Sequence, residues 1–218
     1  MLLTSTINAK GVYYTMLNRQ IRELAMKGEK AITVENVLGQ RYIGGGLHHN
    51  VVITIHGTPG QDLGAFMNGP RIVVHGNAQD GVGNTMNNGA IVIHGKAGEI
   101  PGHSMRGGII IIRDDAEYRA GIHMKEYEDQ IPLIVIGGTV KDYCGEYMAG
   151  GRMVVLNRLN DSYPAGNDVG TGIHGGVIYI RGNVDSRRLG VGAVFDTLND
   201  DDKNFLQQAI SLFKQEFP

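Results

Sequence analysis

The apolar residues between Val51 and Gly182 fall in runs of five or six, each too short for a helix and separated from the next by a glycine-rich turn. Within each run the positions alternate, which is typical of strands that bury one face. Aligning the runs gives two apolar columns, two positions apart, that we expect to point into the core. The columns are Ile53, Ile72, Ile91, Ile110, Ile134, Met153, Ile178 and Ile55, Val74, Ile93, Ile112, Ile136, Val155, Ile180.

The turns carry a second pattern, in which a glycine is followed three residues later by a methionine. Four copies follow one another every 19 residues, and two more return after short insertions, with Ile173 in the last methionine place. Self-similarity at a fixed period predicts stacked, nearly identical turns, with the methionines filling the core opposite the strands. The structural repeat residues are Gly64, Met67, Gly83, Met86, Gly102, Met105, Gly121, Met124, Gly145, Met148 and Gly170.

Parallel strands joined by tight corners predict an all-β fold, a single-stranded parallel β-helix of about seven coils. Amphipathic spacing predicts an N-terminal helix over 12–27 and a C-terminal helix after Asn199. The segment 39–47 is unlike the later repeats and is expected to be a loop or an irregular coil. We expect one domain over 1–218, with 1–50 as N-terminal helix and lead-in strand, 51–182 as β-helix repeats, and 183–218 as C-terminal segment and helix.

Between the two inward columns lies a third, which on a strand must point outward. It carries no charge, and a strand face in water should carry some. We expect this strip to be covered by the N-terminal helix or by a partner chain, while the terminal helices are also candidates to cover the open end rungs or a side face. After Thr54, the candidate partner-covered or helix-covered strip is Val73, Val92, Ile111, Val135, Val154 and Tyr179.

Composition narrows the function classes. The net charge is −2 and the pI is about 6.4, with basic residues scattered along the chain, so nothing favours a nucleic-acid or anionic-membrane partner. The 33 glycines are accounted for by the repeat rather than by disorder. With no long apolar run and no signal-like start, we expect a cytoplasmic protein.

Three histidines occupy one column at the ends of successive strands, and an arginine follows them. Stacked imidazoles one rung apart could share a metal ion, whereas a polar outward ladder beside a corner is the simpler interpretation and fits the arginine. The four residues are His56, His75, His94 and Arg113.

Two further groups could carry chemistry. Asp80 and Glu99 align and could form an acid/base pair, although a solvated corner is the simpler interpretation. Cys144 could be a reactive thiol or a small buried side chain. We assign no catalytic, cofactor-binding or metal-binding residue.

Several words of the sequence resemble the C-terminal GXGXG domain of the glutamate synthase large subunit. They are GQRYIGGGL at 39, GTPGQDLGAFMNG at 57, GNAQDGVGNTM at 76, SMRGG at 104, YRAGIHMKEY at 118, GEYMAGG at 145 and TGIHGGVIYIRG at 171. The resemblance implies a right-handed β-helix that acts as a scaffold between a glutaminase domain and a flavin-binding synthase barrel while ammonia passes between them. The sequence departs from the family pattern at the corner 114–116 and at Ile173.

The same resemblance implies parts that this chain lacks. The family's glutaminase uses an N-terminal cysteine where this chain has Met1, and its iron–sulfur cluster needs several cysteines where this chain has one. We therefore expect a stand-alone subunit, non-catalytic by itself, that assembles with a glutaminase (amidotransferase) subunit and a flavin-binding synthase subunit. Flavin and the iron–sulfur cluster are expected on those partners, and self-association is possible. The alternatives are a component of a formylmethanofuran dehydrogenase, an enzyme in which one of the chains shares the repeat phrase, and an independent β-helix hydrolase.

Overall fold

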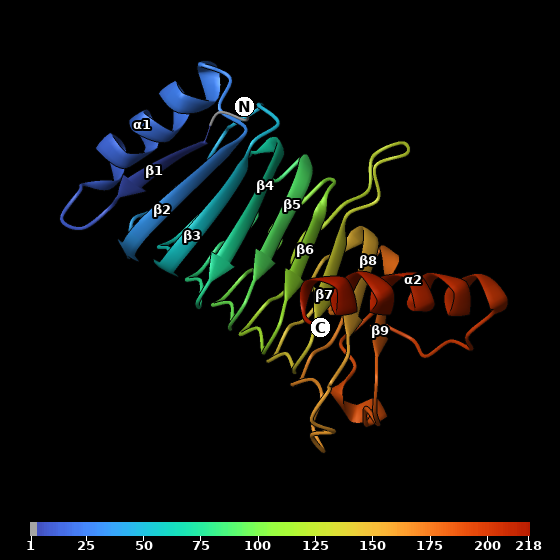
Figure 1. The fold of residues 1–218 in the computed structure, drawn as a ribbon. Helices are drawn as coiled ribbons and strands as arrows, with labels where there is room; N and C mark the ends of the chain where they lie inside the picture. Colours follow the sequence, from blue (N-terminus) through green and yellow to red (C-terminus); the bar gives the residue numbers. More distant parts are fainter. Residues whose placement is uncertain (1–3) are drawn as a thin grey trace.

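Residues 4–218 of the computed structural model form one nine-stranded parallel sheet, whose strands are hydrogen-bonded in the order of the sequence (Figure 1). Two α-helices lie at the ends of the chain, α1 (Tyr14–Met26) and α2 (Asp200–Glu216), and a 3-10 turn spans Ser186–Arg188. The strands are β1 (Thr4–Asn8), β2 (Ala31–Leu38), β3 (Val52–Thr58), β4 (Asn68–His75), β5 (Asn88–Ile93), β6 (Ile109–Ile112), β7 (Leu133–Ile136), β8 (Ala149–Val155) and β9 (Gly175–Ile180).

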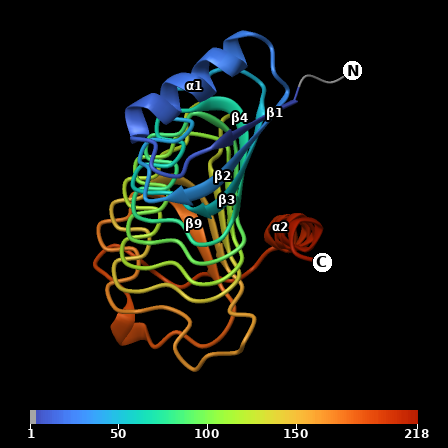
Figure 2. The ribbon, with the colours of Figure 1, turned by 60° about the vertical axis from the view of Figure 1, so that its left-hand side comes forward.

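The strands belong to a β-solenoid, whose successive coils stack on one another in Figure 2. Ile53 pairs with Ile72, and Ile72 with Ile91, so the first inward column is in register from coil to coil. These three side chains are fully buried. The seven strands from β3 to β9 bound about six turns rather than the seven coils expected, because a turn is complete only when the chain reaches the next strand.

Each corner of the repeat places three residues in the left-handed backbone region at alternate positions. In the corner before β4 they are Asp62, Gly64 and Phe66, with φ of 60°, 66° and 58°. The alternation turns successive N–H groups in opposite directions, so Asp62 and Phe66 donate to the next coil and Gly64 donates to the preceding one. The same three positions recur as 81, 83, 85, as 100, 102, 104, as 119, 121, 123, as 143, 145, 147 and as 168, 170, 172.

The middle position of the three needs glycine for a second reason, which is space. A Cβ added to Gly64 would lie 2.7 Å from Cδ1 of Ile91, and one added to Gly83 would lie 2.6 Å from Cδ1 of Ile110. The flanking positions face outward and accept side chains as large as Phe66. The repeated glycine therefore lets the corner pack directly on the isoleucines of the sheet.

The segment 39–47 is a corner of the same kind, and the expectation of a loop or an irregular coil is corrected. Gly44 has a φ of 73°, and the N–H of Gly64 donates to the carbonyl of Ile43 at 2.8 Å. Leu47 stands in the methionine place and is buried. The corner escaped the repeat pattern because leucine replaces methionine and two further glycines follow Gly44.

The corner at 114–116, where the sequence departs from the family pattern, keeps the geometry of its neighbours. Ala116 is fully buried and forms parallel bridges with Ala97 on one side and Val140 on the other. Oδ1 of Asp115 accepts a hydrogen bond of 2.9 Å from the N–H of Thr139. The departure in sequence therefore leaves the stacking of the coils unchanged.

The helix α1 covers the N-terminal end of the solenoid, as Figures 1 and 2 show. Its buried residues Leu17, Ile21 and Ala25 join the interior core cluster. Nδ2 of Asn18 donates to the carbonyl of Arg41 at 2.8 Å, which ties the helix to the first corner. The end rung, whose apolar interior would otherwise face water, is closed in this way.

The helix α2 lies across the outer face of the sheet, and Figure 2 shows it end-on beside the solenoid wall. It begins at a capping box, in which Asn199 and Asp202 each accept from the other's backbone N–H. At its far end Glu216 accepts a 2.6 Å ion-pair hydrogen bond from Arg71 on β4. A helix of 17 residues spans about 25 Å, which matches about five strand spacings of about 4.8 Å.

Candidate functional site

The outward strip predicted from the sequence lies for the most part beneath α2. Ile111, Val135, Val154 and Tyr179 form a second buried cluster with Ala209 and Phe213 of the helix. The helix over the strip is therefore α2, whereas the expected cover was the N-terminal helix or another chain. The helix α1 is not available for this face because its apolar stripe closes the end rung.

The strip continues toward the N-terminal strands with decreasing cover. Val92 on β5 is fully buried, Val73 on β4 is partly buried, and Thr54 on β3 is also partly buried. Beyond them Val52, on the same face of β3, is 38% exposed. The uncharged column therefore passes from beneath α2 to the open surface between β5 and β3.

The three histidines stack along the outer face in strand order. The rings of His56 and His75 lie 4.8 Å apart between centroids with an angle of 11°, and those of His75 and His94 lie 4.7 Å apart. The edge of Phe217, just beyond α2, closes the ladder against His94 at 4.9 Å. At the other end Oε1 of Glu35 lies 3.9 Å from Nε2 of His56. The arrangement fastens the end of α2 to the sheet.

The ladder also changes the acid–base properties of its innermost ring. Burial lowers the pKa of His94, and the charges of His75 and Arg113 lower it further, while Glu216 opposes them. The neutral ring is therefore favoured, which suits stacking at close range. Across residues 4–218, no cluster of three or more His, Cys, Asp or Glu side chains has the arrangement to hold a metal ion.

The carboxylate of Asp80 acts as a link between coils. Its Oδ1 accepts a hydrogen bond of 2.9 Å from the backbone N–H of Glu99. Asp142 makes the same link to Asn167 at 2.7 Å. The alignment of Asp80 with Glu99 thus has a structural explanation in the corner itself.

The side chain of Cys144 is fully buried, and its Sγ lies 3.3 Å from Sδ of Met153. Burial raises the pKa of the thiol to about 12, so the thiol stays protonated near neutral pH. A protonated thiol without access to solvent is not a nucleophile. The methionines 67, 86, 105, 124 and 148 of the repeat are likewise fully buried.

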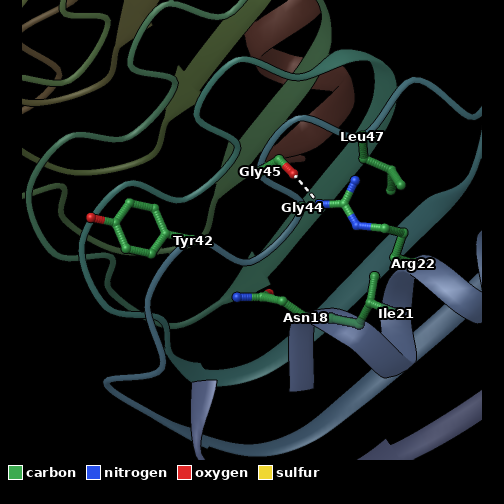
Figure 3. Close-up of a pocket in the computed structure, with 7 residues that line it drawn as sticks. All are labelled: Asn18, Ile21, Arg22, Tyr42, Gly44, Gly45 and Leu47. Atoms are coloured by element: carbon green, nitrogen blue, oxygen red, sulfur yellow. Dashed lines mark hydrogen bonds between the residues drawn. The ribbon is translucent and has the colours of Figure 1, made fainter. Parts of the chain in front are cut away.

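Two pockets open on the surface. The first, where α1 meets the first corner, has a volume of about 10 Å³, enough for about one water molecule (Figure 3). There Arg22 donates a 3.1 Å hydrogen bond to the carbonyl of Gly45. The pocket is part of the contact between helix and solenoid, and it is too small for a substrate.

The second pocket is larger, about 500 Å³, and was not predicted from the sequence. Its signal in the sequence is twofold, namely a polar column directly after the methionines and a five-residue insertion after Met124. The pocket is lined by Asn68, Asn87, Arg106, Lys125, Tyr127 and Gln130.

Within residues 4–218, no helix combines the length and apolar character needed to cross a bilayer.

The fold and its corners define a parallel β-solenoid built on alternating left-handed residues with a glycine at the centre. A family model described as the GXGXG motif matches residues 19–217, and the chain belongs to this family, that of the C-terminal domain of the glutamate synthase large subunit. The chain is also 49% identical over 218 residues to an uncharacterized protein of Methanocaldococcus jannaschii, and the match covers 97% of this chain and 84% of that protein.

Proposed function

We propose that this chain is the structural subunit of a glutamate-synthase-like assembly. In this proposal it holds a glutaminase subunit and a flavin-binding synthase subunit together while ammonia passes from one to the other. The observation that carries the proposal is the family match, because residues 19–217 include every corner of the solenoid. Flavin and the iron–sulfur cluster are then carried by the partner subunits, and the assembly works in the cytoplasm.

The use that the fold makes of its reactive side chains supports a structural role. Cys144 is buried and protonated, Asp80 bonds the next coil, and the histidines stack against the end of α2. Each of these groups stabilises the solenoid at its own position. In the proposed assembly the chemistry therefore takes place on the other subunits.

Purification of the tagged chain from its own cells tests the proposal. We expect two kinds of chain to co-purify in fixed ratio, one an amidotransferase that hydrolyses glutamine and one that carries flavin. Mass spectrometry identifies the chains, and visible absorbance identifies the flavin. Recovery with the other chains of a formylmethanofuran dehydrogenase would contradict the proposal and favour that enzyme instead. A purified chain that hydrolyses a polysaccharide by itself would favour an independent hydrolase.

A further inference from the structure

We infer that the 500 Å³ pocket binds a small oxyanion, a carboxylate or a phosphate. This inference goes beyond the proposed function, because it rests on the residues of the pocket and not on any partner. The pocket lies between a ladder of four side chains, Asn68, Asn87, Arg106 and Lys125, and the insertion at 126–131, which we term the overhanging loop.

The ladder is a regular feature of the solenoid. Its members follow the methionine place on four consecutive coils. The N–H groups of Asn87, Arg106 and Lys125 each donate at 2.9 Å to the carbonyl of the methionine one coil before. Adjacent members are therefore held about 4.8 Å apart along the solenoid, and the two cationic residues are neighbours.

The overhanging loop is fixed in place by hydrogen bonds and by glycines beneath it. Tyr127 and Gln130 exchange two backbone hydrogen bonds, of 3.1 and 2.9 Å, which close the loop into a tight turn. Oε2 of Glu126 accepts a 3.1 Å hydrogen bond from the N–H of Gly151 and so seats the loop on the next coil. A Cβ added to Gly107 would lie 2.9 Å from Oε1 of Gln130, so the glycine leaves room for the loop to fold back over the ladder.

The charge of the pocket is unbalanced. Arg106 and Lys125 form no ion pair within residues 4–218, and no carboxylate is among the residues that line the pocket. Like charges on adjacent rungs repel each other, and an anion between them removes the repulsion. The acidic residues of the loop do not serve, because Glu126 is bonded to Gly151 and neither Glu128 nor Asp129 lines the pocket.

The donors present select an oxyanion of small size. The guanidinium of Arg106 can bind two oxygens in its plane, and the ammonium of Lys125 adds a point charge. The amides of Asn68, Asn87 and Gln130 supply further donors around the same space. A volume of about 500 Å³ lies within the range of small-molecule sites.

Calorimetric titration of the full chain at low ionic strength tests the inference, with inorganic phosphate and succinate as the two probes. We expect saturable binding of at least one probe, and the stronger one shows whether the natural ligand carries phosphate or carboxylate. The double variant Arg106→Gln/Lys125→Gln should weaken that binding by about tenfold or more. The matched control is Arg19→Gln/Lys10→Gln, which removes the same charge from exposed residues outside the pocket and should bind like the parent chain.

A second variant separates binding from folding. Tyr127→Ala removes one wall of the pocket without touching a charge, and it should weaken the same probe while the urea midpoint stays at the parent value. The inference is overturned if neither probe binds saturably up to about 10 mM. It is also overturned if the control double variant loses as much affinity as the pocket double variant.

Discussion

The hydroxyl of Tyr179 donates a 2.7 Å hydrogen bond to Oδ1 of Asp202, which joins the last strand of the solenoid to the first turn of α2. The other oxygen of the same carboxylate accepts from the N–H of Asn199 and completes the capping box. Burial and the bond to Asp202 raise the pKa of Tyr179 to about 12, so the donor stays protonated. One carboxylate thus both starts the helix and attaches it to the sheet.

The variant Tyr179→Phe removes that donor and keeps the ring. We expect a loss of about 0.5–1.5 kcal/mol in the free energy of unfolding, because the freed carboxylate oxygen can still bind water. Urea denaturation of the isolated chain measures it. The control is Tyr163→Phe at an exposed ring, which should leave stability unchanged. Equal stability of both variants would show that the Tyr179 bond does not hold α2.

The variant Ile111→Asp tests whether α2 covers the strip within the isolated chain. Ile111 is 3% exposed under the helix, so an aspartate there buries a charge without a partner. We expect a loss of at least about 3 kcal/mol in the free energy of unfolding. Val52→Asp, on the same sheet face beyond the helix, should cost within about 0.5 kcal/mol. A parent-like urea midpoint for Ile111→Asp would contradict the packing of α2 on the strip.

The variants Gly83→Ala and Gly46→Ala separate the two reasons for glycine in the corners. Both positions have positive φ, of 67° and 62°, but an added Cβ meets Ile110 at 2.6 Å in the first and nothing within 4 Å in the second. Gly46→Ala should cost about 1–2 kcal/mol for the backbone alone. Gly83→Ala should cost about 1–3 kcal/mol more, because the core is overpacked. Equal costs in thermal or urea unfolding would show that space plays no part.

Those corners also show how far the sequence could be used to predict the structure. The fixed spacing of Gly64 and Gly83 predicted the stacked turns, because a backbone in the left-handed region beside a packed core admits little else. The corner at Gly44 was missed because Leu47 hides the pattern. The position of α2 could not be predicted, because its apolar face would fit an end rung as well as a side face. The loop pocket was missed because its residues meet only after coils stack.

Stability should fall in mild acid, and His94 should account for part of the change. Its pKa is lowered in the folded chain by burial, then by His75 and Arg113, so the unfolded chain binds the proton more tightly. The contribution is fully present above about pH 6.5 and is lost as the pH falls from there through the lowered pKa. Burial lowers the pKa of His103 too, so removing His94 leaves part of the dependence.

Urea unfolding at about pH 7.5 and about pH 5.5 measures this dependence. We expect His94→Gln to lose less stability between the two values than the parent chain does. His49→Gln, at an exposed position outside the ladder, should behave like the parent chain. An unchanged pH dependence in His94→Gln would show that the ladder does not affect the protonation of this ring.

Depletion and add-back of the chain measure most directly whether it is the structural subunit of a glutamate-forming assembly. The assembly is purified from its own cells, and formation of glutamate from 2-oxoglutarate is followed with glutamine as the nitrogen source. We predict that removing the chain uncouples glutamine hydrolysis from glutamate formation, and that adding the folded chain restores the coupling. Glutamate formation from glutamine that continues undiminished without the chain would contradict its role as the subunit that joins the two activities.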